Sequence, residues 1–238
     1  MSKTRMTDFR HQARNKEMAR INGKSLAEEL LQKFKKDWPF KKDRPPGLAV
    51  IQVGNDPASS AYIRGKENAA QSVGINFQHL KLSSSSSFSQ IKEVIDKISK
   101  DSKVDGLILQ LPLDLENPLT ASEVQTLLEL IPPGKDADGL HPFNLGRVAG
   151  GESSPQNWTS PIPATPLGMM RMLEKQGFSL KGTRSVVIGK SRIVGMPIAM
   201  LLSQAGSTVT ICHRQTPDFG VHTREANLIV VAAGKKHL

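Results

Sequence analysis

The chain has 238 residues, of which 38% are hydrophobic and 23% charged. This balance predicts one large or two small folded domains and argues against disorder over the whole chain. No apolar run reaches the roughly 20 residues that a membrane helix needs. The N-terminus lacks the apolar core of a secretory signal, and the single cysteine, Cys212, excludes an intrachain disulfide and a multi-cysteine zinc site. We therefore expect a protein of a reducing compartment.

The net charge of +10 raises the question of nucleic-acid binding. Residues 1–45 hold 13 Lys/Arg against 6 Asp/Glu, which accounts for +7 of the +10. The excess is thus a basic N-terminal region, and one tyrosine with two tryptophans offers little surface for base stacking. We expect a flexible basic arm over residues 1–20 and no nucleic-acid partner. Asp8 and Glu17 count against a mitochondrial presequence, so the cytoplasm is favoured over the mitochondrial matrix.

The first half of the chain alternates helical and strand patterns. A helix is predicted from Ser25, with Glu28 completing a capping box. The further predicted elements are a strand at 48–53, a helix from Pro57 to about 72, a strand near 77–82, a serine-rich loop at 83–87, a helix around 91–98 and a strand at 104–110.

The alternation pauses over residues 132–164, which are rich in proline, glycine and asparagine, and then resumes. The later elements are a helix at 166–175, a strand at 185–189, a helix at 194–204 and strands at 208–212 and 228–233. This order predicts an α/β fold with mainly parallel sheets. The irregular stretch places a domain boundary, with one domain over residues 21–160 and a second over 161–238.

The segment from Val186 to Pro197 has the pattern of a strand, a tight turn and a helix start. Gly189 allows the turn, Gly195 allows close approach of helix and sheet, and backbone N–H groups at the helix start can receive a pyrophosphate. Ser191 replaces the middle glycine of the usual dinucleotide fingerprint. A plain α/β crossover with no bound nucleotide is the alternative.

The next strand ends with Cys212, His213 and Arg214, and the first carboxylate after it is Asp218. An arginine here favours the 2′-phosphate of NADP over the 2′-hydroxyl of NAD. Lys190 and Arg192 add positive charge at the turn. Alternatively, Arg214 is an ordinary solvent-facing charge. We interpret Cys212 as a buried strand residue rather than a nucleophile.

In the first half, Tyr62 and Lys66 are four residues apart on one helix face. They follow the strand at 48–53, and Gln110 closes the strand at 104–110, so all three can meet at the carboxyl edge of a sheet. A partly desolvated lysine there can transfer protons, and the tyrosine can stack on a flat heterocycle. The alternative is an amphipathic surface pair. For Asp136 and Asp138, the default interpretation is a turn, with metal ligation or substrate anchoring as alternatives.

Six segments in order carry a family resemblance: Gly47–Gly54, Asp56–Lys66, Val104–Pro112, Lys135–Gly139, Pro163–Pro166 and Gly189–Pro197. The chain resembles the bifunctional 5,10-methylenetetrahydrofolate dehydrogenase/methenyltetrahydrofolate cyclohydrolases from about Ile21 to Leu238. The resemblance implies two lobes, an N-terminal α/β folate-binding lobe and a Rossmann-like NAD(P)-binding lobe.

The resemblance also implies residue roles. Lys66 matches the catalytic lysine, and Tyr62, Gln110 and Asp138 match residues that stack on folate, tune the lysine and anchor the pterin. The implied substrate-binding residues are Ser59, Tyr62, Gln110, Leu111, Pro112, Asp138, Thr165 and Pro166. The implied cofactor-binding residues are Gly189, Lys190, Ser191, Ile193, Gly195, His213, Arg214, Ala233 and Gly234. No metal is implied.

The implied reaction is the NADP-dependent oxidation of 5,10-methylenetetrahydrofolate to the methenyl cation, followed by hydrolysis to 10-formyltetrahydrofolate. Lys190 replaces the family's common arginine and keeps the charge but not the bidentate grip on phosphate. NAD stands as the alternative cofactor. A different NADP dehydrogenase would leave Tyr62, Lys66, Gln110 and Asp138 unexplained.

The resemblance implies a homodimer formed through the cofactor domain. Family members continue past the position of Leu238, so we expect an incomplete NAD(P)-binding lobe with an unprotected sheet edge and reduced or absent activity. That expectation argues against the dimer. It also leaves a non-catalytic remnant of the family, an interaction fragment, as the alternative function.

Overall fold

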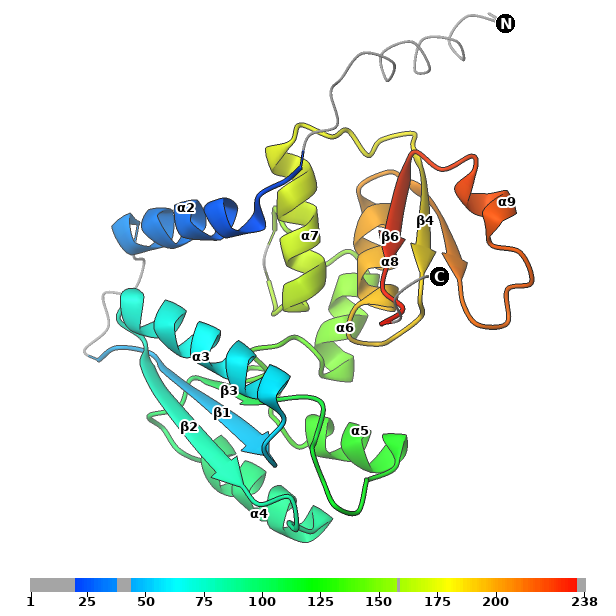
Figure 1. The fold of residues 1–238 in the computed structure, drawn as a ribbon. Coiled ribbons are helices and arrows are strands. Elements are labelled where there is room, and N and C mark those ends of the chain that lie inside the picture. The colour runs from blue at the N-terminus through cyan, green and yellow to red at the C-terminus, as the bar shows by residue number, and fades with distance from the viewer. Residues whose placement is uncertain (1–19, 38–43, 158, 235–238) are drawn as a thin grey trace, which may run out of the picture.

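The computed structural model describes residues 20–37, 44–157 and 159–234 and shows two lobes, each built on a three-stranded parallel sheet (Figure 1). The basic arm predicted over residues 1–20 lies, apart from Arg20, outside the described residues. A long amphipathic helix, α2 (Gly23–Lys36), lies between the lobes on one side of the molecule. None of the described helices is long and apolar enough to cross a membrane.

The first lobe contains the sheet order β2-β1-β3. Its elements are β1 (Gly47–Val53), α3 (Pro57–Ser72), β2 (Asn76–Leu82), α4 (Phe88–Ser99), β3 (Gly106–Leu109) and α5 (Ala121–Glu129). Side chains alternate across the central strand: Val50 packs toward Ile63 of α3, whereas Ile51 packs with Ile91 of α4 and Leu127 of α5. Helices therefore cover both faces of the sheet, as a parallel sheet requires.

The second lobe contains the sheet order β5-β4-β6. Its elements are α7 (Ala164–Lys175), β4 (Arg184–Ile188), α8 (Gly195–Gln204), β5 (Thr208–Cys212), α9 (Gly220–Thr223) and β6 (Leu228–Val231). Helix α8 is apolar nearly all round because it packs against the sheet, α7 and α6 (Pro142–Ala149). β6 is an edge strand of the described sheet and leaves Ile229 and Val231 exposed.

Three sequence-based predictions differ from the structure. The first helix begins at Gly23, and the capping box predicted at Ser25 and Glu28 is wrong. Asn22 is the N-cap because its side-chain oxygen accepts hydrogen bonds from the backbone N–H groups of Lys24 and Ser25. The stretch predicted to be irregular contains α6, and neither α5 nor α9 was predicted. The strands at 104–110 and 228–233 are shorter than predicted, at 106–109 and 228–231.

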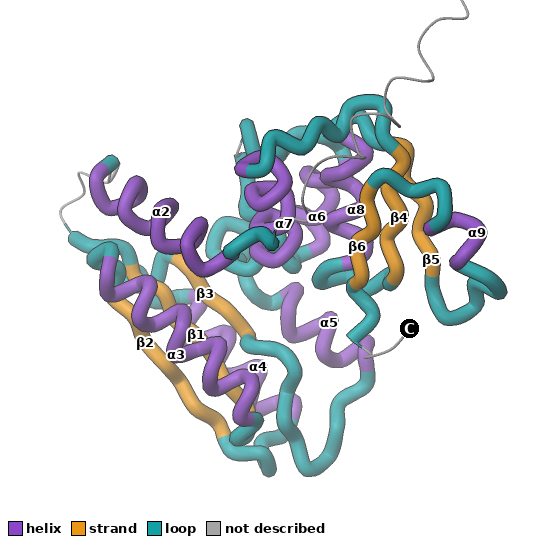
Figure 2. The backbone as a smooth tube through the Cα atoms, turned by 45° about the horizontal axis from the view of Figure 1, so that its top comes forward, coloured by secondary structure: helices purple, strands orange, loops and turns teal. Residues whose placement is uncertain are grey.

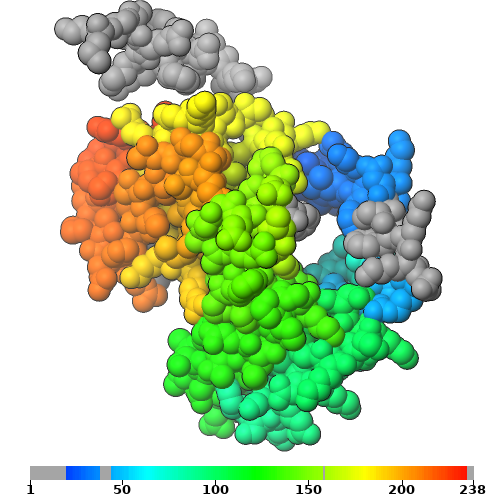
Figure 3. Space-filling model, turned by 180° about the vertical axis from the view of Figure 1, so that it is seen from behind, coloured from blue at the N-terminus to red at the C-terminus, as the bar shows by residue number. Residues whose placement is uncertain are grey.

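Helix α6 connects the two lobes. It is separated from the second lobe by the loop before α7, yet its Val148 belongs to the core formed by Ile198 and Leu202 of α8. The tube drawing and the space-filling view from behind both show the segment of α5 and α6 running between the lobes (Figures 2 and 3). Helix α6 therefore contributes to the core of the second lobe although it precedes that lobe in the sequence.

Candidate active site

A cavity of about 230 Å³ lies at the carboxyl end of the first sheet and receives residues from both lobes. Its lining residues are Tyr62, Lys66, Leu109, Gln110, Leu111, Asp138, Leu140, Pro163, Ala164, Thr165 and Ile193. Ligands bind at this edge in open α/β sheets because the loops and helix starts after the strands converge there.

Three polar side chains meet on the wall of this cavity. The Nζ atom of Lys66 donates to Oε1 of Gln110 at 3.2 Å and to both carboxylate oxygens of Asp138 at 3.3 Å. Gln110 is only 8% exposed, and its Nε2 donates to the carbonyl of Leu111, which fixes its Oε1 toward the lysine. The side chains of Lys66 and Asp138 remain partly exposed to the cavity. Lysine, amide and carboxylate together form a site that can hold and transfer a proton.

Asp138 changes the interpretation of Lys66. The strand-end pattern placed Tyr62 and Gln110, both uncharged, near Lys66, whereas the structure also places a carboxylate beside the ammonium. Burial raises the pKa of the Asp138 carboxyl, and the positive charge and hydrogen bond of Lys66 oppose this rise. The Asp138 carboxyl therefore holds a proton to higher pH than an exposed aspartate does.

Asp136 and Asp138 have different surroundings although they are two residues apart. Asp136 is 4% exposed and accepts hydrogen bonds from the backbone of Leu140 and His141 and from Asn144. Asp136 therefore forms the turn that composition predicted, whereas Asp138 faces the cavity. No cluster of three possible metal-ligating side chains occurs among the described residues.

Tyr62 is 70% exposed and presents its ring to the cavity from α3. Such exposure of an aromatic side chain next to a polar site suits stacking on a flat ligand. Of the other predicted substrate residues, Gln110, Leu111, Asp138 and Thr165 line the cavity. The cavity lining does not include Ser59, Pro112 or Pro166.

Ser59 lies in the first turn of α3 and is only 2% exposed. Its hydroxyl has no hydrogen-bond partner among the described residues. Pro112 follows a cis peptide bond and is exposed, and Pro166 is buried within α7. Leu109, Leu140, Pro163 and Ala164 also line the cavity and were not among the predicted substrate-binding residues.

A second cavity, of about 570 Å³, lies at the carboxyl end of the second sheet. It is lined by Ile188, Gly189, Lys190, Ser191, His213, Arg214, Gln215, Ala232 and Ala233. Six predicted cofactor residues thus meet here: Gly189, Lys190, Ser191, His213, Arg214 and Ala233. Gly234 follows Ala233 at the exposed end of the described chain. Ile188, Gln215 and Ala232 were not predicted.

The turn between β4 and α8 is tight for a visible reason. Gly189 has φ +121°, a conformation that other residues rarely adopt, and a Cβ there would lie 2.5 Å from the carbonyl oxygen of Ala232. A Cβ on Gly195 would lie 2.1 Å from the carbonyl oxygen of Gly189. The hydroxyl of Ser191 accepts from the backbone N–H groups of Val194 and Gly195 and so holds the loop at the helix start. These features build a cradle for a group that approaches the backbone closely.

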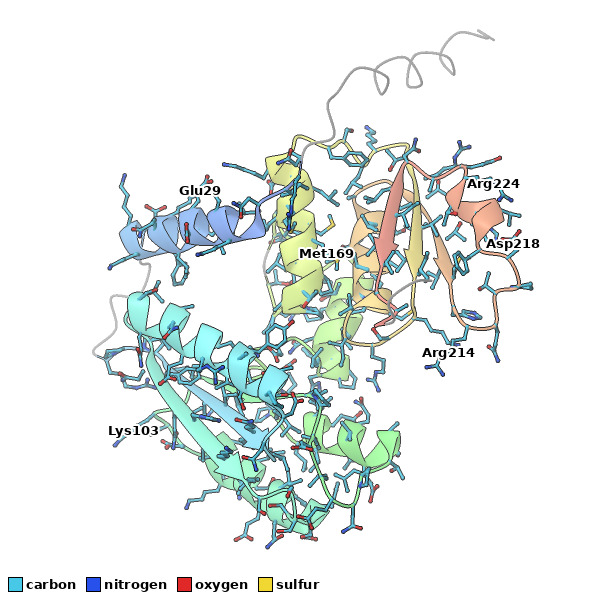
Figure 4. All side chains as sticks on the ribbon, in the orientation of Figure 1. Glu29, Lys103, Met169, Arg214, Asp218 and Arg224 are labelled. Atoms are coloured by element: carbon cyan, nitrogen blue, oxygen red, sulfur yellow. The ribbon has the colours of Figure 1, made fainter. Side chains whose placement is uncertain are left out.

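Basic side chains surround this cradle. Lys190 and Arg214 are exposed and line the cavity, and Figure 4 shows Arg214 past the end of β5, on the side of the second lobe toward the first. Cys212 is fully buried among apolar neighbours, and burial raises the pKa of its thiol. It is therefore a strand residue of the core, as predicted.

Ile193 lines the first cavity and not the second. It belongs to the turn that carries Gly189 and Ser191, yet it shares the lining of the first cavity with Tyr62. The sequence grouped it with the cofactor residues. Its position shows that the nucleotide-type turn of one lobe forms part of the wall of the other lobe's site.

The protein has two α/β lobes, and its proton-transfer site opens beside a dinucleotide-type turn. This combination defines the class of NAD(P)-binding dehydrogenases. The comparisons with known proteins agree. Residues 21–138 match the model of the tetrahydrofolate dehydrogenase/cyclohydrolase catalytic domain, and residues 163–238 match that of its NAD(P)-binding domain. The chain belongs to the tetrahydrofolate dehydrogenase/cyclohydrolase family.

Relatives and solved structures support this assignment. The bifunctional protein FolD of Synechococcus sp. strain CC9902 is 43% identical over 220 residues, which cover 91% of this chain and 71% of that protein. The FolD structure from Campylobacter jejuni has a TM-score of 0.82 at 35% identity, covering 92% of this chain and 74% of that one. The Trypanosoma brucei enzyme, solved with NADP and an inhibitor, has a TM-score of 0.82 at 29% identity, covering 91% and 72%.

Proposed function

We propose that this chain oxidises 5,10-methylenetetrahydrofolate to the methenyl form with NADP and hydrolyses that product to 10-formyltetrahydrofolate. The observation that carries the proposal is the Lys66 ammonium, held between Gln110 and Asp138 in a cavity that the dinucleotide-type turn helps to line. Both activities are those of the family to which the chain belongs.

In this proposal the pterin lies in the first cavity and stacks on Tyr62. Asp138 holds the amino edge of the pterin, while Leu111, Pro112, Thr165 and Pro166 belong to the surrounding segments. Ser59 supports the start of α3 close to this face. Apolar side chains from both lobes, including Ile193, exclude water around the reacting carbon until hydride has left.

NADP, when bound, accepts the hydride from the methylene carbon. The residues present fit it: the turn at Gly189 leaves room for a pyrophosphate against the backbone, and Lys190 and Arg214 offer positive charge. Arg214 supports NADP over NAD because a guanidinium matches the 2′-phosphate. Gly195, Ser191, His213, Ala233 and Gly234 complete the proposed cofactor contacts.

The methenyl carbon is electrophilic, so water adds to it and loses a proton, and the bond from that carbon to N5 then breaks as N5 takes up a proton. Lys66 and Asp138 lie side by side where they can take part in these proton transfers. Gln110 keeps the ammonium oriented without adding charge. The alternative of a non-catalytic remnant gains no support from this arrangement, since the three side chains meet with hydrogen-bonding geometry.

We propose a folate-binding domain over residues 21–160 and a cofactor domain over 161–238, with α6 packed against the latter across the boundary. The proposed location is the cytoplasm. A homodimer is the assembly that family membership supports, and size-exclusion chromatography with light scattering tests it. The clustering of basic residues in 1–45 supports the absence of a nucleic-acid partner.

The test is turnover by the purified full chain. With methylenetetrahydrofolate and NADP, we expect NADPH and 10-formyltetrahydrofolate to accumulate together. With NAD in place of NADP, we expect a lower kcat/KM. Absence of both products, with the folded state verified by circular dichroism, would contradict the proposed function.

A further inference from the structure

A buried carboxylate, Asp136, lies next to the active site without lining either cavity. Its side chain is 4% exposed, and a buried charge is costly unless hydrogen bonds compensate it. Three donors do so: the backbone N–H of Leu140 at 3.1 Å, that of His141 at 2.8 Å and the side-chain amide of Asn144 at 2.8 Å.

These three bonds connect the segment beside β3 to the start of α6. The backbone of Asp136 forms a parallel bridge with Leu107 of β3, the strand that leads to Gln110. Its carboxylate reaches forward to the start of α6, where Asn144 also donates to the carbonyl of Pro133 at 2.9 Å. One side chain thus connects the edge of the first sheet to the helix that packs on the second lobe.

Asp138 is located inside this tied segment. The turn that follows it passes through Gly139, at φ +68°, where a Cβ would lie 2.7 Å from the backbone of Ile162 and 2.8 Å from that of Pro163. Pro163 itself lines the first cavity. The segment from 136 to 141 is therefore confined on one side by packing and on the other by the Asp136 carboxylate.

We propose that Asp136 is a positioning residue of the active site: its carboxylate fixes the turn so that Asp138 faces Lys66. The expected effect of Asp136 on turnover rests on the proposed function. This proposal assigns a role to a residue that touches neither substrate nor cofactor, and it explains why a carboxylate rather than an amide occupies this position. Three donors converge on the side chain, and only a carboxylate accepts from all of them without presenting an N–H group.

The electrostatics of the site agree with this arrangement. Two charged groups act on Asp138, Lys66 from α3 and Asp136 from the same turn, while Gln110 at the end of β3 is neutral. Burial contributes most to the raised pKa of Asp138, Lys66 opposes it and Asp136 adds to it. Asp136 thus acts on Asp138 by its charge as well as by its hydrogen bonds.

The experiment is a double-mutant cycle on the full chain. We expect D136N to lower kcat/KM about 10-fold or more, because a displacement of about 1 Å at a reacting group is costly. In a D138N background, D136N should lower kcat/KM by less than about twofold, because the effect of Asp136 on turnover passes through Asp138. D105N is the control for loss of a carboxylate that accepts from the backbone: Asp105, just before β3, accepts from the N–H of Gly47 at 2.8 Å and pairs with Arg44, and it lies outside both cavities.

Hydrogen exchange gives a readout that does not depend on turnover. D136N should accelerate exchange at the amides of Leu140 and His141, whereas D105N should leave them unchanged. N144A keeps two of the three donors to Asp136 and serves as a milder variant if D136N fails to fold. It should lower kcat/KM less than D136N does, and this loss should likewise shrink in the D138N background.

The outcomes are separable. If the loss caused by D136N is equal in the two backgrounds, or if D136N loses no more activity than D105N, the positioning role is wrong. If the wild-type chain shows no turnover, the proposed function fails, and exchange at Leu140 and His141 alone then decides the positioning role. Unchanged exchange at these amides in D136N and in N144A would overturn it.

Discussion

The ammonium of Lys66 and the carboxylate of Asp138 lie 3.3 Å apart although 72 positions separate them in the sequence. Helix α3 supplies the lysine, and the turn before α6 supplies the aspartate. Only folding of the first lobe brings these charges together, at the edge where β1 and β3 end. The chemistry of the site therefore depends on the packing of that lobe.

Lys66→Met tests the lysine directly. Loss of the ammonium removes the group that transfers the proton and leaves Asp138 without its cation, so cyclohydrolase activity should fall by roughly 10²- to 10⁴-fold. The measurement is the disappearance of methenyltetrahydrofolate. Lys92→Met is the control, because Lys92 is exposed on α4 at the other side of the sheet. Equal activity of both variants would contradict the assigned role.

Asp138→Asn tests the raised pKa of Asp138. The folded chain holds the Asp138 proton to higher pH than the unfolded chain, so ionisation costs stability as pH rises between the two pKa values. At neutral pH the free energy of unfolding of the variant should be equal to that of the wild type or higher, by at most about 1 kcal/mol. This difference should vanish below the usual pKa of an aspartate.

Urea denaturation across a pH series measures this difference. Glu123→Gln is a control of opposite sign, because hydrogen bonds from Thr120 lower the pKa of Glu123. The stability that ionised Glu123 contributes in the wild type is present above the pKa of Glu123 in the unfolded chain and is lost as pH falls. An Asp138→Asn variant whose relative stability declines as pH rises would show the assignment to be wrong.

Much of the site could be predicted from strand ends. Tyr62, Lys66 and Gln110 were placed together because parallel strands end at one sheet edge, and the structure brings all three to one cavity. The contact between Asp138 and Lys66 could not be derived from spacing, since a turn was the default for both aspartates. The different surroundings of Asp136 and Asp138 arise from contacts with α6, a helix hidden in a stretch rich in proline and glycine.

The missed elements have local causes. Helix α6 spans only Pro142–Ala149, and its pattern is weak because it buries only Asn144 and Val148. Asn22 and Ser25 are both good caps by type, and only the observed hydrogen bonds choose between them. The position of Ile193 on the first cavity depends on how the lobes sit together, which no local pattern encodes.

Gly195→Ala tests the dinucleotide turn. The added methyl group would lie 2.1 Å from the carbonyl oxygen of Gly189, so the start of α8 must move. We expect a loss of about 1 to 3 kcal/mol of stability and weaker NADP binding. Gly168→Ala in α7 meets nothing within 4 Å and should stabilise by up to about 1 kcal/mol. Denaturant midpoints and NADP titrations of both variants provide the measurement, and unchanged NADP binding in Gly195→Ala would argue against a cofactor at this turn.

Arg214→Ser tests the choice of cofactor. Loss of a guanidinium that contacts the 2′-phosphate should weaken NADP binding about 10- to 100-fold and change NAD binding little. Arg224→Ser is the matched control, because Arg224 pairs with Asp218 beside α9, on the outer side of the lobe (Figure 4). Calorimetric titration with each cofactor measures the effect. Equal losses for NADP and NAD would assign Arg214 to a contact common to both.

The most direct test is a crystal structure of the chain with NADP and a folate substrate analogue bound. We predict a pterin stacked on Tyr62, with the Nζ atom of Lys66 within hydrogen-bonding reach of the one-carbon position and the nicotinamide over it. A folate bound elsewhere, or a Lys66 amine directed into bulk water and away from the one-carbon unit, would contradict it.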